Sequence, residues 1–171
     1  MFSVYKKEIK SYFITPVGYI FTGVFLAVSG LLFSLCTLYQ TESSSVSLYF
    51  SLLFIVLAVL LPLLTMKLLS DERRTKTEQL LLTSPISLFG MICGKYFAAL
   101  TLYGATLLVN SINFVLLYVY GEPNLSVILA DIIAIFFVGA AFLAVGIFIS
   151  ALTESQLIAA VMTILATFGM I

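Results

Sequence analysis

Five apolar runs alternate with short polar segments along the chain. The runs occupy residues 17–39, 46–66, 88–120, 127–152 and 157–171. A helix needs about 20 mostly apolar residues to cross the hydrocarbon core of a bilayer, so the first, second and fourth runs each fit one span. The pattern predicts an all-α, polytopic helical membrane protein with a single transmembrane domain over residues 1–171.

The third and fifth runs depart from the length of one span. As a straight helix, residues 88–120 would extend about 50 Å, against a hydrocarbon core about 30 Å thick. We therefore expect a short interfacial piece at residues 88–95 and a span at residues 96–120. The fifth run, residues 157–171, stops with the sequence, and we expect the domain to be truncated within this fifth span.

Basic residues predict how the chain is oriented. All eight Lys and Arg residues lie in residues 6–10 and 67–95, and the segments around Glu42 and Glu122 carry none. Two spans separate the two basic regions, so both face one side, and the positive-inside rule makes that side cytoplasmic. The expected localisation is the bacterial inner (plasma) membrane, with several spans and a cytoplasmic N-terminus.

The N-terminal residues 1–16 predict an amphipathic helix in the headgroup plane, ending before Pro16. Its two sides carry different side chains: Phe2, Tyr5, Ile9, Tyr12 and Phe13 on one, and Lys6, Lys7 and Lys10 towards the other. The pattern fits an elbow helix that leads into the first span, and ordinary anchoring to the lipid bilayer is equally compatible.

Composition supports a membrane protein and offers little catalytic chemistry. Of the residues, 62% are hydrophobic and 9% charged, and the mean hydropathy is +1.20, outside the range of soluble domains. The formal net charge is zero, so charge gives no reason to expect a nucleic-acid partner. There is no histidine, and the cysteines Cys36 and Cys93 are expected near opposite faces of the membrane, so neither a disulfide nor a metal site is predicted.

Residues 90–95, GMICGK, resemble a phosphate-binding loop only superficially. Three residues rather than four separate the glycines, and Tyr96 stands where that motif has Ser or Thr. Lys95 is instead expected to extend to the cytoplasmic interface. We therefore expect a non-catalytic chain that binds no cofactor of its own.

A charged segment, residues 70–84, separates the second and third runs and predicts a short cytoplasmic helix. Ser70 is a suitable N-cap, acidic residues fill the first turn, and Pro85 ends the helix. Side chains four residues apart can form supporting pairs: Glu72 with Lys76, and Arg74 with Glu78.

Two interpretations of this segment remain open. It can be a solvated loop that only sets orientation, or a docking surface for a cytoplasmic protein. An orientation signal needs scattered basic residues and has no use for balancing acids or for the leucine patch at residues 80–82. We therefore favour the docking surface.

Polar residues inside the apolar runs also have two interpretations. Asn110 and Asn113 are three residues apart and share a helical face, where they can line a substrate path or form interhelical hydrogen bonds. We favour the hydrogen bonds. Asp131 lies near the outer face and is interpreted as structural. Small residues such as Gly139 and Gly146 in the fourth run suit close helix packing.

Longer motifs resemble a known family. LLSDERRTKTEQLLLTSPIS at residues 68–87, followed by GKYFAAL at residues 94–100, resembles the signature of ABC-2-type transporter permeases. The N-terminal residues and the run VGAAFLAVGIFISALT at residues 138–153 are similar to the gliding-motility-associated branch. Two departures are Lys76, where the family commonly has glycine, and the family's sixth span, for which this chain has no residues.

The resemblance implies a type V exporter-like transmembrane domain and a permease subunit of an ATP-binding cassette exporter. A separate ATP-binding subunit would bind ATP and dock on residues 70–84, the coupling helix. The docking residues by this resemblance are Asp71, Glu72, Arg73, Arg74, Thr77 and Glu78. A second permease subunit, identical or different, and an auxiliary membrane protein are further implied partners. The alternative function is a mechanotransmitting membrane anchor, driven by an ATPase without cargo transport.

Overall fold

The computed structural model describes residues 2–38, 46–66, 88–115, 125–153 and 155–170. All regular structure in these residues is helical, which confirms the predicted all-α polytopic fold. The helices are α1 (Phe2–Ile14), α2 (Pro16–Phe33) with a π-helical extension (Ser34–Leu38), α3 (Val46–Thr65), α6 (Leu88–Asn110), α8 (Leu125–Leu152) and α9 (Gln156–Gly169).

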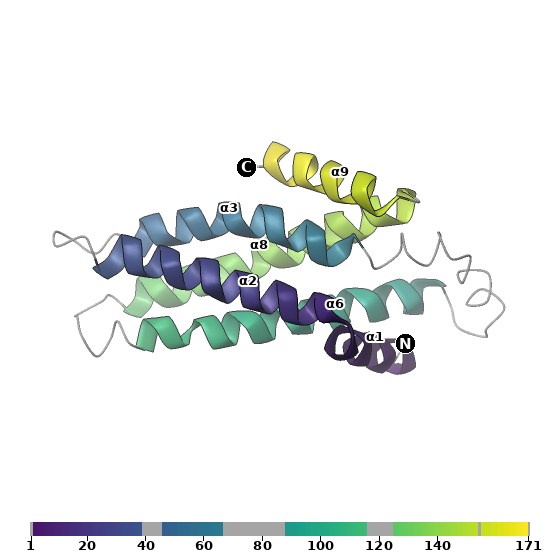
Figure 1. Ribbon diagram of the computed structural model, residues 1–171, viewed down its shortest axis with the longest axis horizontal. Coiled ribbons are helices and arrows are strands. Elements are labelled where there is room, and N and C mark those ends of the chain that lie inside the picture. The colour runs from purple at the N-terminus through teal and green to yellow at the C-terminus, as the bar shows by residue number, and fades with distance from the viewer. Residues whose placement is uncertain (1, 39–45, 67–87, 116–124, 154, 171) are drawn as a thin grey trace.

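Four long helices lie side by side and form the bundle (Figure 1). Helices α2 and α6 run in one direction, and α3 and α8 run in the other. The segments long and apolar enough to cross a membrane are Pro16–Cys36, Leu48–Thr65, Phe89–Val115 and Ser126–Leu152. Helix α1 lies across one end of the bundle, beside the start of α6, and the shorter α9 packs against α3 and α8.

Apolar side chains fill the bundle and also cover its outside. Phe25, Leu57 and Leu143 are fully buried, whereas Leu108 and Phe137 are 74% and 67% exposed. An outer surface of this kind is expected where the surrounding solvent is lipid. Hydrocarbon is as apolar as leucine, so these helices associate through close packing and hydrogen bonds rather than by removing apolar surface from water.

Close packing depends on glycine where α8 meets its neighbours. A Cβ added at Gly139 would overlap the ring of Tyr103 in α6, and one added at Gly146 would overlap the side chain of Thr65 in α3. The Tyr103 ring cannot easily move away, because it is fully buried and its hydroxyl donates to the carbonyl oxygen of Ile135 at 2.8 Å. Both glycines are buried, as expected for small residues at a helix interface.

Helix α6 runs through Tyr96 without a break. The sequence predicted a short interfacial piece at residues 88–95 before a span at residues 96–120, and in the structure one helix extends from Leu88 to Asn110 across this boundary. Its first turns are held by tertiary contacts, since α1 packs against this part of the bundle and Lys95 is buried there.

Replacement of Gly139 by alanine should lower the free energy of unfolding by about 1–3 kcal/mol, because the new methyl group overpacks the contact with Tyr103. The measurement is an SDS titration in mixed micelles. Gly23→Ala is the matched control, since a Cβ at Gly23 meets nothing within 4 Å. Equal stability of the two variants would contradict the proposed packing of α6 on α8.

Candidate functional site

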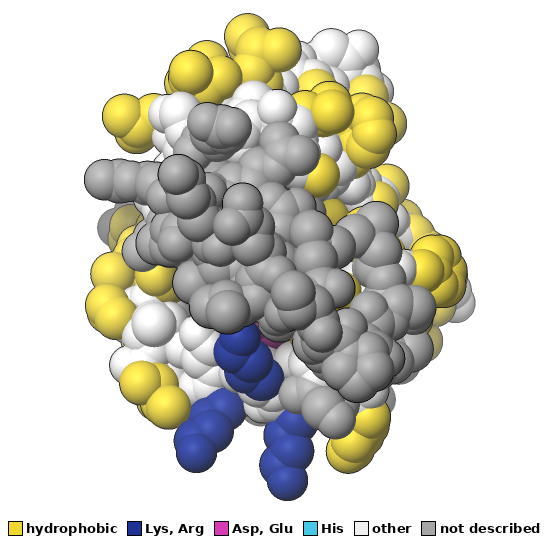
Figure 2. Space-filling view, turned by 90° about the vertical axis from the view of Figure 1, so that its right-hand side faces the viewer, with side chains coloured by type: hydrophobic (Ala, Val, Ile, Leu, Met, Phe, Trp, Pro, Cys, Tyr) yellow, Lys and Arg dark blue, Asp and Glu magenta, His cyan; other side chains and the backbone are white. Residues whose placement is uncertain are grey.

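The end of the bundle that carries α1 concentrates the described positive charge. Lys6, Lys7 and Lys10 are exposed on α1, and Figure 2 shows dark blue side chains gathered at this end. Helix α3 ends and α6 begins at the same end (Figure 1). The exposed lysines make this end of the bundle suited to contact a soluble, negatively charged partner.

A buried ion pair joins α1 to α6. The ammonium group of Lys95 lies 3.4 Å from a carboxylate oxygen of Glu8, and the side chains are 2% and 14% exposed. We expected Lys95 to extend to the interface, but the acidic residue of the elbow helix reaches it inside the protein. The sequence could not indicate this pair, because 87 residues separate positions 8 and 95 (95 − 8 = 87).

Tyr12 secures the same helix from its other end. It is buried one turn after Glu8, and its backbone carbonyl oxygen would lie 2.5 Å from a Cβ added at Gly18. Burial, and secondarily the negative charge of Glu8, raises the pKa of the Tyr12 hydroxyl well above its ordinary value. That hydroxyl has no hydrogen-bond partner among the described residues. The elbow helix is therefore packed into the protein, with Phe2 and Phe13 left exposed from the apolar side that the sequence predicted.

The predicted docking residues fall outside the described part of the chain. Asp71, Glu72, Arg73, Arg74, Thr77 and Glu78 all lie within residues 67–87. The described neighbours of this segment are Met66 and Leu88, which lie at the end of the bundle that carries α1. Both attachment points of the predicted coupling helix are thus at the basic end.

A second polar cluster lies near the opposite end of α6, around Asn110. The amide oxygen of Asn110 accepts hydrogen bonds from the Ser29 hydroxyl at 2.8 Å and from the Asn113 amide at 3.1 Å. Its amide nitrogen donates to the Tyr49 hydroxyl at 3.0 Å. Asn110 is only 3% exposed. One side chain therefore connects α2, α3 and α6.

Aromatic rings pack beside this cluster. The rings of Phe33, Tyr49, Phe50 and Phe114 contact one another with centroids 5.3 to 6.2 Å apart. The structure thus brings the two predicted asparagines together in a buried site with bonds to neighbouring helices. This geometry favours interhelical hydrogen bonding over the lining of a substrate path. Sequence reasoning missed the partners Ser29 and Tyr49, for which no local pattern gives a signal.

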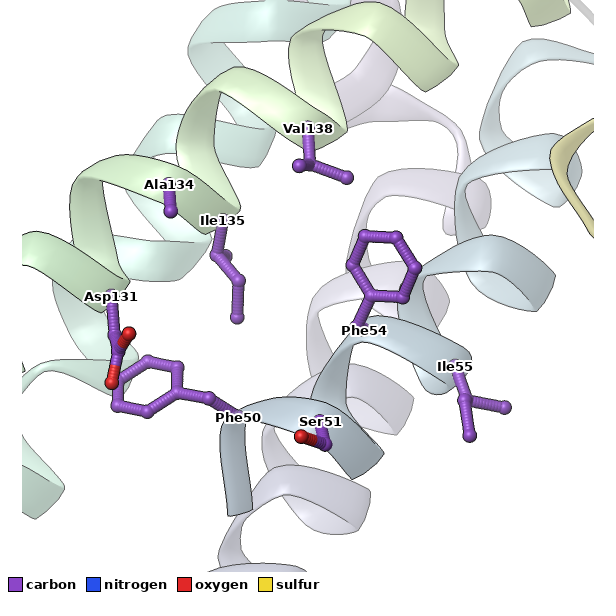
Figure 3. A pocket seen from close by; sticks show the side chains of 8 residues that line it. All are labelled: Phe50, Ser51, Phe54, Ile55, Asp131, Ala134, Ile135 and Val138. Carbon is purple, nitrogen blue, oxygen red and sulfur yellow. The ribbon is translucent and has the colours of Figure 1, made fainter. Parts of the chain in front are cut away.

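A groove of about 510 Å³ lies between α3 and α8 (Figure 3). Its walls are apolar except at one end, where Asp131 and Ser51 lie. Asp131 is half-buried there. Sequence reasoning identified Asp131 as an ionisable residue of the fourth run but did not predict the groove, because the lining residues of α3 carry no distinguishing pattern. The described residues contain no group of three or more side chains suited to bind a metal ion.

Comparison with protein families gives one match that covers almost the whole chain. A family model described as "ABC-2 family transporter protein" matches residues 3–171. Neither the curated proteins nor the solved structures gave a match.

Asn110→Leu should lower the free energy of unfolding by about 1–2 kcal/mol, because it leaves the buried hydroxyls of Ser29 and Tyr49 without this partner. The control is Asn113→Leu, which removes a half-buried side chain bonded to Asn110 and should cost less. Both are measured by SDS titration. Wild-type stability of the Asn110 variant would favour the substrate-path interpretation instead.

A double-mutant cycle of Glu8→Gln and Lys95→Met should give a coupling free energy of about 1–3 kcal/mol, because both charged groups are largely buried. Unfolding of the wild type, the two single variants and the double variant supplies the four free energies. Lys7→Met removes an exposed lysine of the same helix and should show no coupling to Glu8→Gln. Additive effects at Glu8 and Lys95 would argue against the ion pair.

Proposed function

The chain belongs to the ABC-2 family of transporter proteins, and on this premise we propose that it is the permease subunit of an ATP-binding cassette exporter. The observation that carries the proposal is the family match over residues 3–171. The described residues include four helices long and apolar enough to cross a membrane, which agrees with this role. In the proposed division of labour, this subunit forms the membrane path and a separate subunit binds and hydrolyses ATP.

We place the contact with the ATP-binding subunit on residues 70–84, through Asp71, Glu72, Arg73, Arg74, Thr77 and Glu78. Two features support this proposal: the residue types of the segment and its position in the chain. The segment combines charge pairs with a leucine patch, and it connects α3 to α6 at the basic end of the bundle. A soluble partner on the cytoplasmic side would meet this segment first.

The buried contacts of α1 suggest how a movement of the coupling helix would be transmitted to other helices. Residues 67–87 lead directly into α6, and Lys95 in the second turn of α6 pairs with Glu8 in α1. A displacement of the coupling helix would therefore move the start of α6 and the elbow helix together. The Asn110 cluster holds the far end of α6 to α2 and α3, so α6 would tilt about that end.

Orientation and partners complete the proposal. The basic end would face the cytoplasm of a bacterium, with the chain in the inner membrane. A second permease subunit, identical or different, would complete the path, and an auxiliary membrane protein is a further expected partner. The family description names no branch, so placement in the gliding-motility-associated branch rests on the sequence resemblance of residues 1–26 and 138–153.

The test is co-purification with ATP-binding proteins from the native cells. The full-length protein would be purified in mild detergent after labelling with photoreactive ATP, and labelled chains would be identified by mass spectrometry. The double reversal Glu72→Lys with Arg74→Glu should reduce the labelled partner at least about tenfold, because it inverts the pattern of charge at the contact without altering net charge.

Glu42→Lys with Glu122→Lys is the control, since these residues lie in segments predicted on the other side of the membrane. It should leave the partner bound if the variant still inserts with native topology. Absence of any ATP-labelled partner with the native protein would sink the exporter proposal. A partner that couples ATP hydrolysis to movement, with no ATP-dependent flux in vesicles, would support the mechanotransmitting anchor.

A further inference from the structure

The groove between α3 and α8 has the size and shape of a ligand site. Its volume of about 510 Å³ falls within the range of about 300 to 1,000 Å³ common for small-molecule pockets. Helices α3 and α8 run in the same direction (Figure 1), so Phe50 and Ser51 lie level with Asp131 at one end. One turn beyond Val138, the ring of Phe142 contacts the ring of Phe54, which lines the groove, with centroids 5.5 Å apart.

The groove is polar at one end and apolar along the rest of its length. Asp131 and Ser51 supply oxygen atoms at the outer end, whereas Phe54, Ile55 and Val138 make the remainder apolar (Figure 3). A ligand that fills it must therefore be amphipathic, with a polar group at one end and a hydrocarbon body.

The expected charge of the ligand's polar group follows from the distribution of charged residues along the chain. All eight Lys and Arg residues lie at residues 6–10 and 67–95. Residues 6–10 and 95 lie at the opposite end of the bundle, and both attachment points of residues 67–87 lie there too. Asp131 is separated from that end by most of α8, about 30 Å of helix. Among the residues that the structure describes, no lysine or arginine lies near Asp131.

Other groups that could neutralise the negative charge of Asp131 also contribute little. A second copy in the same orientation would hold its described basic residues, Lys6, Lys7, Lys10 and Lys95, at the same distant end of the bundle. Asp131 is the seventh residue of α8, beyond the first turn over which the helix dipole acts. An ionised carboxylate at the edge of the hydrocarbon region is costly without a partner. A bound cation would remove that cost.

We infer that the α3–α8 groove binds a cationic amphiphile. Its ammonium group lies against the carboxylate of Asp131 and the ring of Phe50, which can add a cation–π contact. Its hydrocarbon body follows Phe54, Ile55 and Val138. This site is separate from the coupling helix, and binding there requires neither ATP nor an ATP-binding subunit.

The probe is octadecylamine carrying a diazirine in its alkyl chain, reconstituted with the full-length protein in zwitterionic-lipid nanodiscs. At pH 7 its amine is an ammonium group. Mass spectrometry of the cross-linked peptides should place the label on α3 and α8, at about tenfold higher yield than the same probe with an alcohol in place of the amine. Equal yields from the two probes would overturn the inference.

Three variants make the test specific to the carboxylate. Asp131→Asn should reduce labelling by the amine to the level of the alcohol, and Asp131→Glu should retain the preference. Ile133→Asn introduces the same amide at an exposed position of the same helix and should leave labelling unchanged. Unchanged amine labelling in a folded Asp131→Asn protein would overturn the proposal, while Val138→Trp, which fills the groove, should abolish labelling by both probes.

Discussion

The bundle depends on one constraint: hydrocarbon offers no partner to a polar group, so a polar side chain buried within a membrane-spanning helix must find its partner on a helix. Asn110 satisfies it with Ser29 and Tyr49, which connects three helices through one side chain. Tyr103 and Thr167 satisfy it with backbone carbonyl oxygens of neighbouring helices, α8 and α3. Since lipid competes for apolar contacts but not for these bonds, they specify which helices are neighbours.

The same constraint explains what the sequence could predict. Apolar runs predict the number and order of the long helices, because a span is recognised by hydropathy and length alone. They do not predict which side of a span faces the interior. Phe137 and Phe142 are the same residue type on one helix, yet Phe137 is 67% exposed and Phe142 is 3% exposed. Because the lipid and the core of the bundle are equally apolar, the hydrophobic pattern does not show which side chains face the interior and which face the lipid.

Polar residues indicate in part which side of a helix faces the interior of the bundle. The spacing of Asn110 and Asn113 correctly indicated one polar face, but their partners are far away in the sequence; 81 residues separate Asn110 from Ser29. The pair of Glu8 and Lys95 was hidden in the same way. It fixes α1, which the sequence predicts to lie in the headgroup plane, to the start of α6. The sequence contains the interacting groups, and only the fold brings them together.

The uneven distribution of charged residues affects both ends of the bundle. The described basic residues lie at one end of the bundle, as the positive-inside rule requires if that end faces the cytoplasm, and there they can meet a soluble partner. That confinement has a consequence for the other end. The carboxylate of Asp131 lies at one end of an apolar groove, and the described basic residues lie at the opposite end of the bundle. In the proposed orientation, the charge distribution that directs the chain into the membrane would also favour cations at the opposite face, because the described basic residues do not neutralise the carboxylate there.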